Sequence, residues 1–113
     1  MRWPEFLDSF FFSVSDEDES EGHLYQIVKF YSITLQLLFL PEIEGGELNL
    51  KGFSIDGPGA GKSDKKIRRI MRLYGRHMAQ RHNVNKVTIF GGKRTTGAKP
   101  GRNPSPIVIF QAN

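Results

Sequence analysis

One segment of this chain has the pattern of an amphipathic helix, and the runs on either side of it have the composition of strands. Between Ser63 and His82, apolar residues recur every three or four positions, at Ile67, Ile70, Met71, Tyr74 and Met78. Ser63 is a favourable N-cap, and Asn83 and Asn85 end the pattern. A chain of 113 residues is long enough for one hydrophobic core and too short for two ordinary domains. We therefore expect one main helix that covers a small sheet.

Two other features of this helix carry predictions. Four arginines lie off the apolar stripe, namely Arg68, Arg69, Arg72 and Arg76. A charged outer face is usual for a surface helix, so we interpret these arginines as a source of electrostatic attraction for an anion and not as reaction-centre residues. Gly75 in the middle of a helix costs about 1 kcal/mol relative to alanine, which predicts a close approach by another element at that position.

The strand predictions rest on β-branched and aromatic composition and on turn signals. Leu24–Leu40 has polar residues at helical spacing but is rich in β-branched and aromatic residues, so we interpret it as a strand. Pro41–Gly46 is a turn signal, and Leu48–Ile55 completes a hairpin. Lys86–Gly91 and Ile107–Phe110 are predicted as the third and fourth strands.

The N-terminal part is predicted to hold a helix and a linker. Trp3–Val14 has aromatic and aliphatic residues at helical spacing, and Asp16–Gly22 has the composition of an acidic loop. The resulting fold class is α+β, a four-stranded, mostly antiparallel sheet packed against one main helix, with a short N-terminal helix, in the order α-β-β-α-β-β. The domain division is 1–22 for the helix and acidic linker and 23–113 for the folded domain.

The net charge of +4 hides a strong separation of charge along the chain. Residues 1–61 hold three basic and eleven acidic side chains, a net charge of −8, whereas residues 62–113 hold thirteen basic and one acidic, a net charge of +12. Such a basic half predicts a polyanion, an acidic protein partner, or contact with its own acidic half. The acidic segment is therefore either a plain linker or a cover for the basic surface.

Several function classes are excluded by composition. The chain has no cysteine, so a disulfide framework or a cysteine zinc site is impossible. His23, His77 and His82 are too few and too scattered to predict a metal site, and no cofactor is expected. The longest apolar run, Leu24–Leu40, is too polar to span a membrane, and Met1–Val14 lacks the basic start of a signal peptide.

A glycine-rich segment precedes the main helix and only partly resembles a phosphate-binding loop. Such a loop needs two glycines five residues apart. In the segment Gly57–Ser63 the second glycine would be Gly61, but the residue five positions before it is Asp56. A carboxylate there repels phosphate, so nucleotide hydrolysis is not predicted. Lys62 can still contact a phosphate group.

The most informative stretch is Gly91–Pro106, which combines a backbone rich in glycine and proline with clustered phosphate-binding side chains. These side chains are Lys93, Arg94, Thr95, Thr96, Lys99 and Arg102. Arginine offers a planar fork, lysine a point charge and threonine a hydroxyl donor, all suited to phosphate oxygens. A merely solvated hairpin loop remains the alternative.

The motifs Gly46–Gly52 and Val84–Arg102 resemble C-terminal toxin domains of bacterial polymorphic toxins of the Rhs and contact-dependent-inhibition types. The resemblance covers about residues 45–106. Many such domains are metal-independent ribonucleases of the barnase, colicin and RelE-like class. The resemblance implies an endoribonuclease toxin that cleaves tRNA or rRNA in the cytoplasm of a target cell, with an acidic immunity protein as partner.

RNA cleavage without metal uses the ribose 2′-OH as nucleophile and needs an acid, a base and cations around the phosphate. We assign the phosphate clamp to Arg94 with Lys93, a hydroxyl donor to Thr96 or Thr95, flanking phosphate contacts to Lys99, Arg102 and Lys62, and the candidate base to His23. Two other classes remain open. One is a non-catalytic nucleic-acid-binding module, and the other is a protein-interaction domain that uses the basic face.

Overall fold

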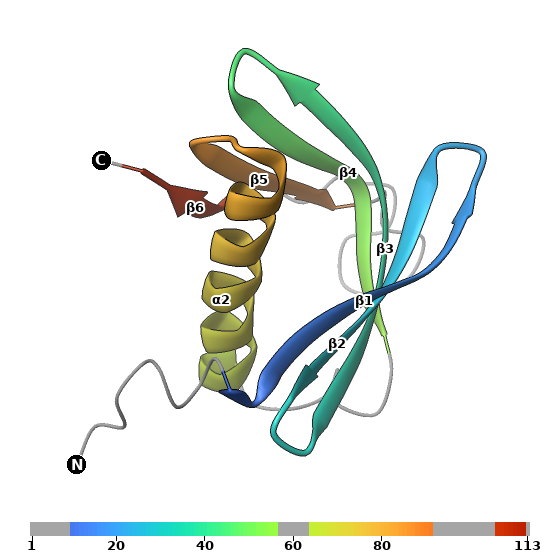
Figure 1. Cartoon of the computed structure of the whole chain (residues 1–113), viewed down its shortest axis with the longest axis vertical. Coiled ribbons are helices and arrows are strands. Elements are labelled where there is room, and N and C mark those ends of the chain that lie inside the picture. The colour runs from blue at the N-terminus through green and yellow to red at the C-terminus, as the bar shows by residue number, and fades with distance from the viewer. Residues whose placement is uncertain (1–9, 57–63, 92–105, 113) are drawn as a thin grey trace, which may run out of the picture.

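The computed structural model describes residues 10–56, 64–91 and 106–112, and in it one sheet of six strands is crossed by a long helix (Figure 1). The elements in chain order are β1 (Phe12–Ser20), β2 (His23–Phe30), β3 (Ile33–Glu44), β4 (Glu47–Asp56), α2 (Asp64–His82), β5 (Lys86–Gly91) and β6 (Ile107–Gln111). The strand order in the sheet follows the chain order. Neighbouring strands are antiparallel except β4 and β5, which are parallel and are connected through α2.

The predicted four-stranded, mostly antiparallel sheet with an N-terminal helix is wrong. The sheet is six-stranded and mixed, and Phe12–Val14, predicted as the end of a helix, begins strand β1. Residues 3–9 of that predicted helix lie outside the described residues. The physical reason lies in β2, since Phe12 pairs with Phe30 and Val14 with Val28. Apolar residues two apart face the core once a partner strand is present.

The acidic stretch Asp16–Ser20, interpreted from its composition as a loop, is also part of β1. It pairs with β2 through an irregularity between Asp16 and Asp18, and the turn is confined to Glu21 and Gly22. Strand β1 is the edge of the sheet, and charged residues on an edge strand oppose pairing with the strands of other chains. High charge therefore did not prevent a strand here.

The stretch Leu24–Leu40, predicted as a single strand, is two strands joined by a turn at Tyr31 and Ser32. Tyr31 takes a left-handed backbone conformation with φ of 55°, which an aromatic residue rarely adopts, so no turn residue marked the break. The next hairpin was predicted and is confirmed, but its turn is shorter than expected, because Pro41–Glu44 of the predicted turn belong to β3. Gly45 and Gly46 connect β3 to β4 with φ of 58° and 78°, the backbone that a two-residue hairpin turn requires.

The predicted main helix is confirmed from Asp64 to His82. Its apolar stripe packs on the sheet, with Ile70, Tyr74 and Met78 fully buried. Asn83 follows with φ of 53°, and the Val84 N–H donates to the Ala79 carbonyl at 3.0 Å. This is the hydrogen bond that closes many helix C-termini.

The predicted close approach at Gly75 is confirmed as well. A β-carbon at this position would lie 2.7 Å from the carbonyl oxygen of Ile109 in β6. Only glycine therefore lets α2 pack this closely against the last strand.

The helix and the concave face of the sheet enclose the core. Its largest side chains come from β3, β4 and α2, and the set includes Leu35, Leu37, Phe39, Leu48, Leu50, Ile70 and Tyr74. Two polar residues, Gln26 and Thr88, are also buried. The first of these takes part in a hydrogen-bond network described below.

Candidate functional site: a basic groove beside the main helix

A groove of about 800 Å³ lies between the first half of α2 and strands β4, β5 and β6. Its apolar lining comes from both the strands and the helix, namely Ile55, Ile67, Met71, Ile89, Ile107, Val108 and Ile109. Five cationic side chains from the first half of α2 complete the lining, namely Lys65, Lys66, Arg68, Arg69 and Arg72. We call this feature the basic groove.

The parallel pair of strands explains where the basic groove lies. Ile55 and Ile89 come near the carboxyl ends of β4 and β5, and Ile107 begins β6, which runs antiparallel to β5. Open sheets with parallel strands hold ligands beyond the carboxyl ends of those strands. The helix that follows β4 also starts there, so its positive end adds to the field of the cations.

Three of the five cations that line the basic groove have no ionic partner among the described residues. Within residues 10–56, 64–91 and 106–112, Lys65, Arg68 and Arg72 form no ion pair. The guanidinium carbon of Arg69 lies 5.9 Å from the centre of the Phe30 ring, a cation–π distance. The groove therefore offers an anion a cluster of cations over an apolar floor.

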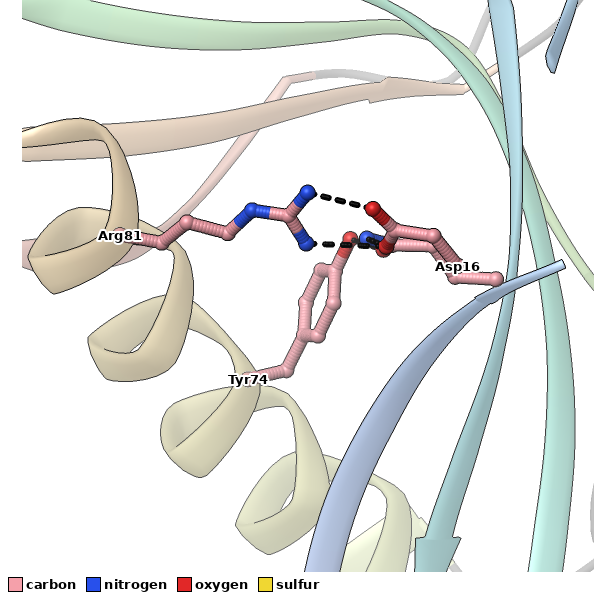
Figure 2. A network of polar contacts seen from close by, with 4 residues as sticks. Asp16, Tyr74 and Arg81 are labelled. Carbon is pink, nitrogen blue, oxygen red and sulfur yellow. Dashed lines mark hydrogen bonds and ion pairs between the residues drawn. The ribbon is translucent and has the colours of Figure 1, made fainter. Parts of the chain in front are cut away.

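A second polar cluster joins the other half of α2 to strands β1 and β2 (Figure 2). The buried hydroxyl of Tyr74 donates to Gln26 Oε1 at 2.5 Å, and Gln26 Nε2 donates to Asp16 Oδ1 at 2.7 Å. Arg81 completes the network, because its Nη1 donates to Asp16 Oδ1 at 2.9 Å and its Nη2 pairs with Asp16 Oδ2. The planar fork of arginine matches a carboxylate in this way.

The charges of this network stabilise the contact of α2 with β1 and β2. The hydrogen bonds from Arg81 lower the pKa of Asp16 to about 2, so its carboxylate is charged at neutral pH. Burial lowers the pKa of His77 and of His82, and the positive charge of Arg81 lowers both further. Their Nε2 atoms are buried and have no hydrogen-bond partner in the described part of the chain. Both imidazoles are therefore neutral at pH 7.

The contacts of Asp16 show whether this part of the acidic segment covers the basic groove. The sequence left two roles open for the segment, a plain linker or a cover for the basic surface. The carboxylate of Asp16 contacts Arg81 in the last turn of α2, whereas the basic groove is lined by the first half of the helix. Glu17 accepts a hydrogen bond from Ser15 within β1 at 2.8 Å. Neither carboxylate lies in the lining of the groove.

Most of the predicted site residues fall outside the described residues. This holds for Lys62, Lys93, Arg94, Thr95, Thr96, Lys99 and Arg102. His23, the candidate base, is exposed at the start of β2 and does not line the basic groove. In Figure 1 the turn between β1 and β2 lies on the side of the molecule away from α2.

The basic groove itself was missed by sequence reasoning. The described residues on both sides of segment 92–105, Ile89 and Ile107, line it, and so do Ile55 and Lys65 on either side of segment 57–63. The sequence did show that each of the two glycine-rich segments follows the end of a predicted strand. Only the parallel pairing of β4 with β5 shows that these ends meet at one place.

The described residues contain neither a metal-ligand cluster nor a helix that could span a membrane. No group of three or more histidine, aspartate or glutamate side chains is placed to hold a metal ion among them. The helical residues that the structure describes include no stretch with the length and apolarity needed to span a bilayer.

No protein-family model, no curated protein and no solved structure matches this chain. The resemblance to polymorphic toxin domains therefore stays a prediction from the sequence motifs.

Proposed function

We propose that this protein binds RNA through the basic groove. The observation that carries the proposal is the set of five lysine and arginine side chains around an apolar floor. Phosphate groups would lie along the cations of α2, and the less polar parts of the nucleotides would lie over the isoleucines of β4, β5 and β6.

A polyanion fits the groove better than a single small anion. Lys65, Arg68 and Arg72, which form no ion pair with other described residues, together carry more positive charge than one phosphate group can neutralise. Binding of this kind is driven largely by the release of counterions and weakens steeply with salt. An acidic protein, such as the predicted immunity partner, would compete for the same cations.

Metal-independent endoribonuclease activity, as in a toxin that acts in the cytoplasm of a target cell, is the second candidate. One observation favours it, because Ile89 and Ile107 line the groove and the Lys93–Arg102 segment connects them along the chain. In this candidate the ribose 2′-OH attacks the adjacent phosphorus, and the 5′-oxygen of the next nucleotide leaves with a proton. Arg94 with Lys93 would stabilise the added negative charge.

One assay tests both candidates. Labelled tRNA is incubated with the protein in EDTA and analysed on native and denaturing gels at 50 and 200 mM salt. We expect a shifted complex in the native gel for the wild type. We expect Arg68→Gln/Arg72→Gln to bind more weakly and to lower the slope of log affinity against log salt by about 1.4, or about 0.7 for each phosphate that is no longer neutralised.

The matched control is Lys29→Gln/Lys86→Gln, which removes the same charge at positions outside the groove lining. Equal weakening by both pairs would mean that net charge alone matters, and it would overturn the assignment of the groove. Discrete products in the denaturing gel that Arg94→Ala abolishes would support the ribonuclease candidate. A shift without products would support RNA binding and remove the ribonuclease candidate.

A further inference from the structure

An exposed aromatic patch lies where β1 begins and where β2 turns into β3. We define it as Phe10, Phe11 and Tyr31, whose exposed fractions are 77%, 53% and 48%. Large aromatic side chains normally gain stability by burial, so three together at the surface point to a binding role.

Two rings of the patch are held in fixed geometry. Phe11 and Tyr31 are stacked, with ring centres 4.7 Å apart and planes 20° apart. The Tyr31 N–H donates to the Phe11 carbonyl at 3.0 Å, which ties the two backbones together. The buried ring of Phe30 supports Tyr31 edge-on at 4.6 Å. The patch is therefore a preorganised aromatic surface rather than a set of independent side chains.

Tyr31 holds its position at a conformational cost. Its φ of 55° is in the left-handed region, where glycine and asparagine are far less strained than an aromatic residue. Its ring contacts Phe11 and Phe30 and is still half exposed, whereas a smaller residue would fit the turn with less strain. Strain of this kind is often found at functional positions.

The patch and the basic groove are linked through one arginine. Arg69 lines the groove, and its guanidinium group also lies over the ring of Phe30, which supports Tyr31. Figure 1 shows the start of β1 and the turn between β2 and β3 at the same end of the molecule as the start of α2. A bound chain can therefore meet the cations and the aromatic rings together.

We infer that the RNA bound by this protein is single-stranded, and that one of its bases stacks on the surface formed by Phe11 and Tyr31. This inference rests on the proposed function and adds the strand state of the RNA and a second contact site. Unpaired bases stack on aromatic side chains next to a cationic groove that follows the phosphates, whereas the bases of a duplex are already stacked inside it.

The test compares a fluorescein-labelled single-stranded RNA of 12 nucleotides with the duplex of the same sequence, by anisotropy at fixed salt. The main variant is Tyr31→Asn, because asparagine tolerates the left-handed turn. Phe11→Ser is combined with it in a second variant. The control is Ile43→Ser, which removes another exposed apolar side chain, near the end of β3.

We expect the wild type to bind the single strand more tightly than the duplex. Tyr31→Asn should weaken binding of the single strand about 5- to 100-fold without changing the salt slope, since it removes a stacking surface and leaves the phosphate-binding cations in place. Tyr31→Phe should retain wild-type affinity, and Ile43→Ser should have no effect. If the double variant does not fold, the inference is tested by comparing the affinities of Tyr31→Asn and Tyr31→Phe for the single strand.

Unchanged affinity in Tyr31→Asn, with weaker binding still seen in Arg68→Gln/Arg72→Gln, would overturn this inference and leave the proposed function standing. Tighter binding of the duplex would also overturn it. No RNA binding by the wild type would remove both. Self-association that the aromatic variants abolish, with RNA affinity unchanged, would assign the patch to contacts between copies of this chain instead.

Discussion

The two halves of α2 carry similar residues but have different environments. The first half, residues 64–72, lies beside the basic groove and presents Arg68 and Arg72 to solvent. The second half, residues 73–82, is held in place by the buried Tyr74, by close contact at Gly75 and by the pairing of Arg81 with Asp16. We call these the groove half and the network half.

The difference shows that the neighbouring strands decide the role of an arginine. The network half lies near β1 and β2, which supply the carboxylate of Asp16 and the amide of Gln26. The groove half faces isoleucines of β4, β5 and β6. A cation beside a carboxylate stabilises the fold, whereas a cluster of cations beside an apolar wall remains available to an anionic ligand.

The largest expected effect on stability is at Gly75. Gly75→Ala places a methyl group 2.7 Å from the Ile109 carbonyl, and the backbone of β6 must move away. We expect the free energy of unfolding in urea to fall by about 2–3 kcal/mol, despite the gain of about 1 kcal/mol in helix propensity. The control in the groove half, Arg72→Gln, should stay within about 0.5 kcal/mol. A more stable Gly75→Ala variant would contradict the close contact.

The buried hydrogen bond of the network half should have the next largest effect. Tyr74→Phe removes the donor to Gln26 Oε1 while Gln26 stays fully buried, so unfolding should become easier by about 1–2 kcal/mol. The double variant Tyr74→Phe/Gln26→Leu removes both partners of that bond. A double-mutant cycle measured by urea unfolding should then show a coupling above about 0.5 kcal/mol. Additive effects would mean that the bond contributes nothing.

The smallest expected effect concerns acid stability. Because the folded-state pKa of Asp16 is about 2 and its ordinary value is 3.8, the unfolded chain binds more protons in this range. The stabilisation by Asp16 is therefore complete above pH 3.8 and is lost as the pH falls to about 2. Since its side chain is 35% exposed, solvent screening reduces the effect to about 0.5–1 kcal/mol.

Asp16→Asn should remove this part of the pH dependence. Unfolding free energies measured at pH 2, 3, 4 and 7 should converge for the variant and the wild type at the acid end. Glu44→Gln is the control, because this exposed residue at the end of β3 lies outside the network. A parallel pair of curves for Asp16→Asn and the wild type would show that Asp16 does not contribute through its charge.

The sequence predicted local features of this fold better than its pairing. The 63–82 stripe and the turn that contains Gly45 and Gly46 are set by residues close in the chain, and both were predicted, although the predicted turn also included Pro41–Glu44 of β3. The mid-helix position of Gly75 predicted a close approach, but only the fold shows that its partner is Ile109. The break at Tyr31 was not, because a tyrosine in the left-handed conformation has no local signal. Strand β1 was missed because its charged residues become strand residues only through pairing with β2.

The candidate site shows the same limit. The sequence predicted that the cations lie on the main helix and attract an anion. The structure adds that five cationic side chains of α2 line a groove. Its floor combines strands far apart in the chain, so no local pattern contains it. The exposed pairing of Phe11 with Tyr31 likewise joins residues from two different turns of the chain.

By itself, the sequence determined the helix, most of its buried stripe and the accumulation of positive charge in residues 62–113, because each depends on local spacing or composition. Only the tertiary structure decided which cations are neutralised and which border a groove. The reason is that electrostatic compensation depends on what lies within a few ångströms. Which groups lie that close to each cation is set by the parallel pairing of β4 with β5 and by the pairing of β1 with β2.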